Sequence, residues 1–355
     1  MGMSSTSFAA KAADLPMQRN YWIHSKQWDL IFIILSVSLI ALPLVMNRYF
    51  GLSRLMVALS VTILIGGPHM YATFTRTFME KKFVKKHPLI MIGSLLVPVG
   101  VFVLGLNAFI VLLTIFFFWA SIHVLHQVVY LVDCYNTKSS KTLSLQSRLI
   151  DYAVVLTSLY PIAFKRMVDG TFSIGKNSLL FPDFLRQDWV WMAALFVFIF
   201  MLVLYTAKTI REYQDGTILW PKVLLIYTTA IAAFLIPTFN DLDVAFQGMN
   251  TWHSFQYLGL TWYINKLRLE RGEISTGFVQ KISQSNWAYY ATVVGMTLGA
   301  GVIIFLLWKV VGLEYEQCYY ITVLSFLLMH YLHDHMLFTD TEVLQPAAAR
   351  VAIAN

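Results

Sequence analysis

Histidines embedded in apolar sequence are the residues of this chain best able to do chemistry. Seven of the nine histidines lie within long apolar stretches, where an imidazole is costly unless it has a partner. Histidine is the commonest metal-binding side chain, and neutral imidazole suits iron, copper and zinc. The sequence therefore predicts a metal site with these candidate ligands: His69, His123, His126, His253, His330, His333 and His335.

The spacing of several candidates agrees with a shared site. Two pairs are three residues apart, and residues three apart lie on one face of a helix. The pairs are His123 with His126 and His330 with His333. In a regular helix His335 points away from the face of the second pair. The other two histidines, His24 and His87, lie at the edges of apolar stretches, and we interpret them as packing residues.

Polar side chains accompany the histidines in HVLHQVVYLVD (123–133) and FQGMNTWHSFQY (246–257). Lipid cannot satisfy such groups, so these faces are expected to point into the bundle or into a wet cavity. We predict that five of them, together with Asp334, orient the ligands by hydrogen bonds: Asp133, Asn250, Gln127, Gln256 and Tyr130. Exposure at the membrane interface explains the two carboxylates equally well.

Aromatic residues near His253 are candidates for a substrate pocket. Trp252, Tyr257 and Tyr263 are predicted to line it, although an aromatic belt at the bilayer interface is an equal alternative. A further local feature precedes His69 in the stretch IGGPHMYATF. The proline removes a backbone hydrogen bond, so a kink or an unwound turn is expected immediately before this histidine.

The composition places these residues in a membrane protein. The chain is 58% hydrophobic and 13% charged, with a mean hydropathy of +0.63, whereas soluble domains are about a quarter charged. The net charge of +7 comes from short basic connections between apolar runs, so we do not expect a nucleic acid partner. Cys134 and Cys318 are too few for a disulfide framework or a thiolate metal site.

Ten apolar windows are long enough to cross a bilayer as helices. They lie near 28–46, 54–74, 88–104, 106–133, 149–166, 188–210, 218–239, 244–265, 287–311 and 317–338. We predict an all-α, polytopic bundle of about ten transmembrane helices. It forms one domain over residues 28–338, between tails 1–27 and 339–355.

The basic connections predict the orientation. RTFMEKKFVKKH, KSSKTLSLQSR, AKTIREY and NKLRLERGE follow the even-numbered windows, whereas NDLD (240–243) and EYE (314–316) follow odd-numbered ones. By the positive-inside rule both termini are cytoplasmic, and the histidines lie in the inner half of a bacterial inner or plasma membrane, except His253, which lies near its middle. The 167–187 loop is an exception with mixed charge. Residues 1–27 lack a signal-peptide pattern.

A histidine-rich site with few carboxylates favours non-haem iron, one ion or two. Within a membrane, lipophilic substrates and O2 both reach such a site, so we predict an oxygenase that acts on a lipid or isoprenoid. Bilayer lipids and a redox partner are further expected partners. Two alternatives remain open: a b-type haem protein that exchanges electrons with quinone, and a metal or proton transporter.

Three short elements resemble the bacterial Brp/Blh family of membrane enzymes. GGPHMYATF is similar to its Gly-x-Pro-His element, SIHVLHQVVYLVD to an element in which an aspartate follows a histidine, and DHMLF to a stretch near its C-terminus. The resemblance implies a metal-binding role for His69, for His123 or His126, and for His335 or a neighbour. It also implies that iron and O2 cleave β-carotene to retinal, which makes a carotenoid the first choice of substrate.

The chain departs from that family at two places and in its number of histidines. Met-Tyr-Ala follows His69 where a small residue and an aspartate are expected, and Asp334 replaces a proline. The family uses a four-histidine, mononuclear site, and this chain has more histidines than that. The surplus favours a di-iron centre like those of membrane desaturases and hydroxylases, although their paired histidine boxes are missing.

Overall fold

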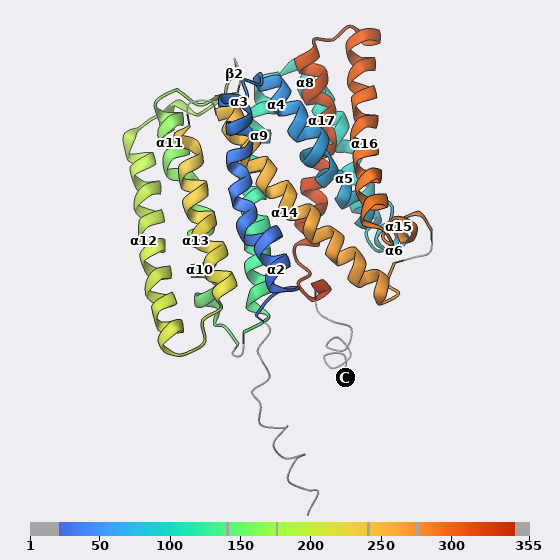
Figure 1. Cartoon of the computed structure of the whole chain (residues 1–355). Helices are drawn as coiled ribbons and strands as arrows, with labels where there is room; N and C mark the ends of the chain where they lie inside the picture. The colour runs from blue at the N-terminus through green and yellow to red at the C-terminus, as the bar shows by residue number, and fades with distance from the viewer. Residues whose placement is uncertain (1–20, 140–141, 175–176, 240–241, 275–276, 345–355) are drawn as a thin grey trace, which may run out of the picture.

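The computed structural model describes residues 21–139, 142–174, 177–239, 242–274 and 277–344. It is a helical bundle, as predicted, with one small addition in the 167–187 loop (Figure 1). There a hairpin pairs two-residue strands, β1 (Ser173–Ile174) and β2 (Asn177–Ser178). Residues 1–20 and 345–355, which make up most of the two expected tails, lie outside the described residues, as do Asn240 and Asp241 of the NDLD turn.

Within the described residues, seven helical segments are long and apolar enough to cross a membrane, so the protein is a helical membrane protein. They span Lys26–Arg48, Arg54–Arg76, Pro88–Asn107, Phe109–Asn136, Asp188–Gln214, Trp220–Thr238 and Asn286–Val311. Three of these are built from long helices: α9 (Phe109–Asn136), α12 (Asp188–Gln214) and α16 (Asn286–Leu306), the last extended by η6 (Leu307–Val311). The others join shorter pieces: α2 (Lys26–Trp28), η1 (Asp29–Ile34), η2 (Leu35–Ile40) and α3 (Ala41–Arg48); α4 (Arg54–Val61), η3 (Thr62–Gly66) and α5 (Gly67–Arg76); α7 (Pro88–Ser94) and α8 (Leu96–Asn107); α13 (Trp220–Leu235) and η5 (Ile236–Thr238).

The other three apolar windows are helical too, but fall short of the hydropathy or the unbroken length of those seven. Window 149–166 is divided into α10 (Leu145–Thr157) and α11 (Tyr160–Val168) just before Pro161, because Pro161 has no N–H to donate to the carbonyl of Thr157, four residues earlier. The other two are α14 (Leu242–Glu270) and α17 (Tyr315–Leu337), which carry many buried polar residues. Polar side chains of that kind are expected where a helix faces protein rather than lipid.

The second segment is interrupted where the sequence predicts it. Thr62–Gly66 forms a π-helical turn, η3, and α5 begins immediately before Pro68. Pro68 has no N–H to offer the carbonyl of Leu64, and the hydroxyl of Tyr290 donates to that carbonyl instead. The predicted irregularity before His69 is therefore confirmed, and α16 supplies the hydrogen bond that the proline removes.

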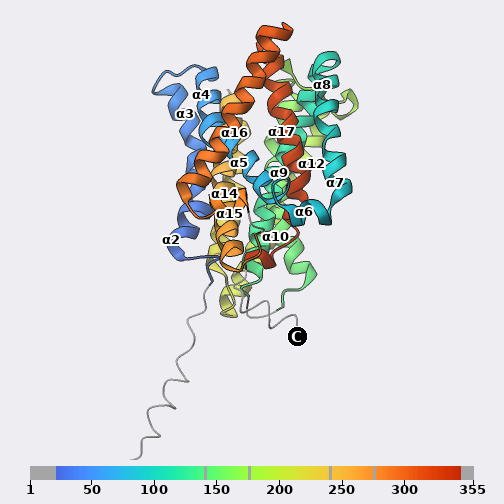
Figure 2. The ribbon, with the colours of Figure 1, turned by 90° about the vertical axis from the view of Figure 1, so that its right-hand side faces the viewer.

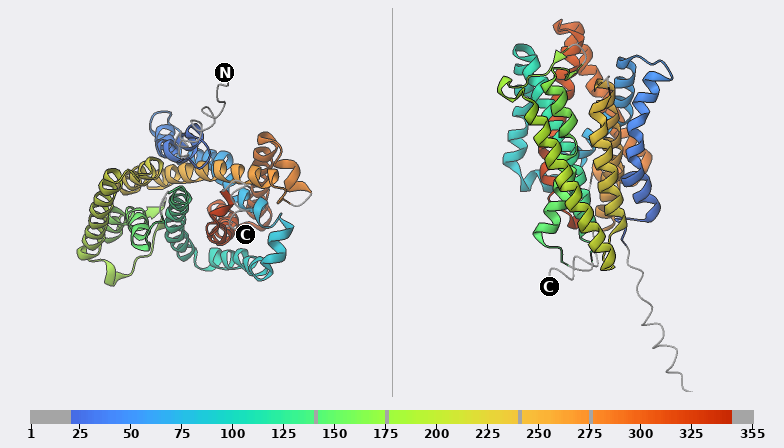
Figure 3. Two further views of the ribbon diagram at one scale, coloured as in Figure 1. Left: turned by 90° about the horizontal axis from the view of Figure 1, so that it is seen from below. Right: turned by 90° about the vertical axis from the view of Figure 1, so that its left-hand side faces the viewer.

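The long helices run side by side, and α14 passes through the middle of the bundle (Figures 1 and 2). Seen along the bundle axis, α10 to α13 gather on one side of α9, and α5, α8, α16 and α17 lie on the other (Figure 3). The remaining short elements are α6 (Lys81–Lys86), η4 (Asp183–Leu185), α15 (Phe278–Ile282) and η7 (Glu342–Leu344).

Candidate metal centre

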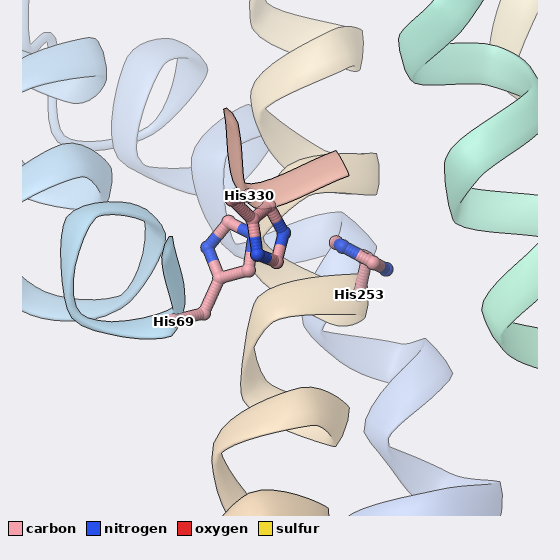
Figure 4. Close-up of side chains that lie close together, drawn as sticks. All are labelled: His69, His253 and His330. Atoms are coloured by element: carbon pink, nitrogen blue, oxygen red, sulfur yellow. The ribbon is translucent and has the colours of Figure 1, made fainter. Parts of the chain in front are cut away.

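Four of the seven candidate imidazoles meet at one point, each from a different helix: His69 of α5, His123 of α9, His253 of α14 and His330 of α17. Consecutive ring centroids around the group lie 5.1 Å (His69–His253), 5.0 Å (His253–His123), 4.9 Å (His123–His330) and 4.7 Å (His330–His69) apart. None is more than 4% exposed. We call this group the histidine ring, and Figure 4 shows three of its members.

The protein leaves the central nitrogen atoms of the histidine ring without hydrogen bonds. The Nε2 atoms of all four imidazoles are buried and have no partner in the described part of the chain, and neither has Nδ1 of His253. Buried polar groups in folded proteins almost always have a partner. Ligand atoms of His69, His253 and His330 lie within 4.8 Å of one another, as do those of His123, His330 and Asp334. Each of these two groups of side chains is spaced so that it could hold a metal ion.

Hydrogen bonds on the outer nitrogen fix the orientation of His69. Its Nδ1 contacts the carbonyl of Gly66, the last residue of η3, and lies 2.8 Å from the hydroxyl of Ser254. Ser254 in turn donates to Asn250 Oδ1 at 3.0 Å. Asn250 therefore supports the ring through Ser254, one contact further away than the sequence predicts. A histidine held by one nitrogen presents the other to a metal.

A second network fixes His330 through Asp334. The Nδ1 atom of His330 lies 2.6 Å from Thr73 Oγ1, and the hydroxyls of Thr73 and Tyr257 donate to Asp334 Oδ1 at 2.8 and 2.6 Å. The other carboxylate oxygen, Oδ2, lies 3.9 Å from His123 Nε2 and has no hydrogen-bond partner in the described residues. Asp334 thus orients one imidazole and points a free oxygen at the ring.

The remaining ring members are held by packing and by the backbone. His123 stacks on Tyr331 with ring centroids 4.0 Å apart. The side-chain amide of Gln127 donates to the carbonyl of His253 at 3.2 Å and to Gln256 Oε1 at 2.9 Å. Gln127 therefore ties α9 to α14 at the level of His253 through the backbone of that histidine, and Gln256 in turn donates to the carbonyl of Ile33, so neither amide reaches the His253 imidazole.

The structure does not bring the other three predicted histidines into the ring. His333 points its Nδ1 at Thr77 Oγ1, 3.1 Å away, and its ring lies against Phe78. His126 and His335 form a separate pair with their ring centroids 5.5 Å apart, and both are at least partly exposed. Packing decides this rather than spacing. Thr77 and Phe78 hold His333 away from the ring, and the imidazole of His126 lies against the side-chain rings of His335 and Phe338 instead.

Two of the predicted supporting side chains lie away from every imidazole of the ring. Asp133 accepts from the guanidinium of Arg148 at 3.1 Å and from the hydroxyl of Tyr152. Tyr130 donates to the carbonyl of Asp340 at 3.0 Å. Both residues stabilise the ends of α9 and α17 instead. Asp133 is partly exposed, at 22%, whereas Asp334 is fully buried.

A cavity of about 400 Å³ reaches the histidine ring from one end of the bundle, and we call it the site cavity. Its outer rim holds Arg54 and Asp243, and its inner lining includes His69 and Tyr331, the residue stacked on His123. The walls between are largely aromatic and aliphatic: Leu55, Phe116, Phe117, Phe246, Tyr319, Tyr320, Val323, Leu324 and Leu327. Such a space suits an apolar chain.

The three aromatic residues predicted for a pocket do not line the site cavity. Tyr257 instead donates to Asp334, and Trp252 is buried in the core. Tyr263 stacks on His24 with ring centroids 4.3 Å apart, which also explains His24 as a packing residue. The aromatic walls come from α9, the start of α14 and the start of α17.

The chain matches no protein-family model, no curated protein and no solved structure. The chemistry of the ring therefore has to be argued from its own geometry. Three of its supporting residues were not predicted from the sequence, namely Thr73, Ser254 and Tyr331. A signal for Thr73 did exist, because it lies four residues after His69 and such residues share a helix face.

Proposed function

We propose that the protein crosses a bacterial inner or plasma membrane with ten helical segments and has both termini in the cytoplasm. The support is that basic connections follow the even-numbered windows, and that α6 and α15 within them lie at the same end of the bundle (Figure 1). A topology reporter fused after Arg271 should register as cytoplasmic, and one in the 167–187 loop as external. The reverse pattern would overturn the orientation and the depth assigned to the histidine ring.

We further propose that the histidine ring binds one non-haem iron ion. The buried, unpartnered Nε2 atoms of His69, His123, His253 and His330 carry this proposal, and neutral imidazole is a suitable ligand for iron. The two groups of possible ligands share His330, whose other nitrogen already contacts Thr73. Because one Nε2 atom binds one ion, this sharing favours a single metal over a di-iron centre.

The activity that fits the site best is an oxygenase that acts on a long lipophilic molecule, with a carotenoid or another isoprenoid as first choice. Bound iron would supply O2 activation, the chemistry that protein side chains alone cannot perform. The apolar walls of the site cavity would hold the chain against His69 and Tyr331 and exclude water. Thr73, Tyr257, Asp334 and Ser254 would fix the imidazoles around the metal.

Haem binding is disfavoured by the packing of the ring. The imidazoles of His69 and His253 are in contact, with their centroids 5.1 Å apart and their planes at 82°. A planar macrocycle has no room between two rings that already touch. A transporter has no specific observation in its favour, and it predicts metal uptake into vesicles without oxygen consumption.

The proposed activity is tested by expression in a bacterium that makes β-carotene. Retinal formation supports cleavage, and a more polar pigment supports hydroxylation. His253→Ala should abolish either change, whereas His126→Ala, outside the ring, should retain it. Unchanged pigment together with unchanged membrane lipids by mass spectrometry would contradict the oxygenase proposal.

A further inference from the structure

A second cavity lies beside the site cavity, and only one layer of side chains separates the two. This lateral cavity has a volume of about 230 Å³ and is lined mainly by η3, α16, η6 and α17. Six residues line both cavities: Leu59, Thr62, Met70, Tyr315, Tyr319 and Val323. Each of the six contributes to both surfaces, so these side chains form a common wall.

The lateral cavity borders the lipid-facing side of α16. Leu298, Phe305 and Trp308 line it and are 54%, 55% and 40% exposed. The helix that carries them is one of the seven segments apolar enough to cross a membrane. Large apolar side chains exposed on such a helix face the acyl chains of the bilayer. An apolar molecule in the membrane can therefore reach this cavity without crossing water.

The common wall contains one hydrogen bond between helices, in which the hydroxyl oxygens of Thr62 and Tyr319 lie 3.0 Å apart. Thr62 is the first residue of η3, the π-helical turn that also supplies the Gly66 carbonyl to His69. Turns of this kind inside helices are frequent at functional sites. A single hydrogen bond between neutral groups changes an equilibrium by roughly tenfold or less. Breaking this one therefore shifts the balance between a closed and an open wall only modestly, and rotation of the Tyr319 side chain would open it.

The other opening of the site cavity is poorly suited to an apolar chain. Arg54 and Asp243 form an ion pair across the rim at 3.4 Å, and Glu316 also lies there. A hydrocarbon passing this rim would have to leave the bilayer and displace water from charged groups, which is unfavourable. The route through the lateral cavity avoids both costs.

We propose that the lateral cavity is the membrane-side half of one binding site for a long acyl or isoprenoid chain, and that Tyr319 is the gate between its two halves. The assignment rests on the proposed function for the nature of the substrate. A chain bound in this way has one part against lipid-facing α16 and another at His69. The substrate is then longer than the site cavity, and it enters sideways from the bilayer.

Two glycines of α16 provide a matched test. A Cβ atom added at Gly301 or at Gly299 meets no other atom within 4 Å, so both positions accept a larger residue. Only Gly301 lines the lateral cavity. Gly301→Leu should therefore fill this cavity, and Gly299→Leu adds the same side chain to the same helix outside it.

The probe is octadecanoic acid with a mid-chain diazirine, added to the full-length protein in phosphatidylcholine nanodiscs and activated by light. In the unaltered protein, mass spectrometry should find label in the lateral cavity, at Ile304 or Phe305, and in the site cavity, at Leu324 or Leu327. Gly301→Leu should lower the site-cavity label roughly tenfold, as expected when a side chain fills space that a ligand needs. Gly299→Leu should leave the site-cavity label unchanged.

Tyr319→Phe tests the gate, because it keeps the aromatic side chain and removes the hydrogen bond to Thr62. It should speed labelling of the site cavity by up to about tenfold.

Equal site-cavity labelling in the unaltered protein and Gly301→Leu would overturn the proposal, and so would an equal loss in both glycine variants or no site-cavity label at all. Iron content is measured on the same samples. Iron-free protein that still shows the Gly301-specific loss would refute the proposed oxygenase and leave the lateral site standing. Iron-loaded protein without that loss would refute the lateral site and leave the proposed oxygenase standing.

Discussion

Two groups of buried polar side chains differ in whether the protein satisfies them. The helices that carry the first group, α10, α12 and α13, lie on one side of α9 (Figure 3). The charge network, among α10, α12 and α13, consists of Asp151, Lys208, Glu212 and Lys222. Lys222 contacts Asp151 at 3.1 Å, Lys208 contacts Glu212 at 3.2 Å, and Lys208 also pairs with Asp151. Every charge in this network has an opposite charge beside it.

The histidine ring has the opposite character. Its imidazoles are as deeply buried as Asp151 and Lys222, yet their Nε2 atoms have no partner among the described residues. An unsatisfied buried polar group lowers the free energy of unfolding. The comparison therefore separates a network that stabilises helix packing from a cluster that is kept at a cost to stability, as is typical of functional sites.

Breaking the charge network should have the largest effect on stability. Asp151→Ala leaves the ammonium groups of Lys208 and Lys222 with only Glu212 to share. Removing one partner from a buried ion pair costs about 3–5 kcal/mol, so we expect a large fall in the free energy of unfolding, measured by circular dichroism in detergent. The control is Asp169→Ala, which removes the exposed pair with Lys165 and should cost at most about 1 kcal/mol. Equal losses in the two variants would show that the network is not structural.

Removing a hydrogen bond to the histidine ring should weaken metal binding without unfolding the protein. Ser254→Ala removes the hydroxyl 2.8 Å from His69 Nδ1. Loss of such a partner typically lowers metal affinity by about 10–100-fold, measured here by competition with a metal chelator. The control is Ser325→Ala, because that buried hydroxyl donates to the Ile321 carbonyl of its own helix. An unchanged affinity in Ser254→Ala would argue against His69 as a ligand.

Replacing a ring histidine by an apolar residue should stabilise the metal-free protein. Neither nitrogen of His253 has a partner in the described structure, so His253→Leu removes two unsatisfied groups from a buried position. We expect the free energy of unfolding of chelator-treated protein to rise by about 1–3 kcal/mol. The same replacement at the partly exposed His126 should have little effect. A clear loss of stability in His253→Leu would mean that this imidazole is a packing residue.

The smallest effect is expected at the rim of the site cavity. The ion pair between Arg54 and Asp243 is partly exposed, at 54% and 22%. Arg54→Ala should therefore change stability by less than about 1 kcal/mol and leave iron content unaltered. If iron content fell as it does in ring variants, the separation between rim and ring would be wrong.

The fold could be predicted in outline because membrane helices are read from composition. Apolar length and the position of Pro68 suffice for the helical windows and for the irregular turn before His69. The helices α14 and α17 lie outside the seven most apolar segments because both carry many buried polar residues, which a helix that faces protein can accommodate and a lipid-facing helix cannot.

The site could be predicted only at the level of which helices meet. A sequence shows that His123 and His126 share a helix face, but not how that helix is rotated against its neighbours. The two histidines lie about one helical turn apart along α9. His123 joins the ring, whereas His126 pairs with His335. Asp133 and Asp334 look alike in the sequence, and only the packing shows that one meets Arg148 and the other meets the ring.

The most direct test of the histidine ring is the iron content of protein purified from membranes and loaded anaerobically with ferrous iron. We predict one iron ion per chain and no Soret band in the absorption spectrum. Alanine at His69, His123, His253 or His330 should lower the bound iron by at least about tenfold, whereas His126→Ala and His335→Ala should retain it. Iron that is lost equally from all six variants, or that never binds, would contradict the ring as a metal centre.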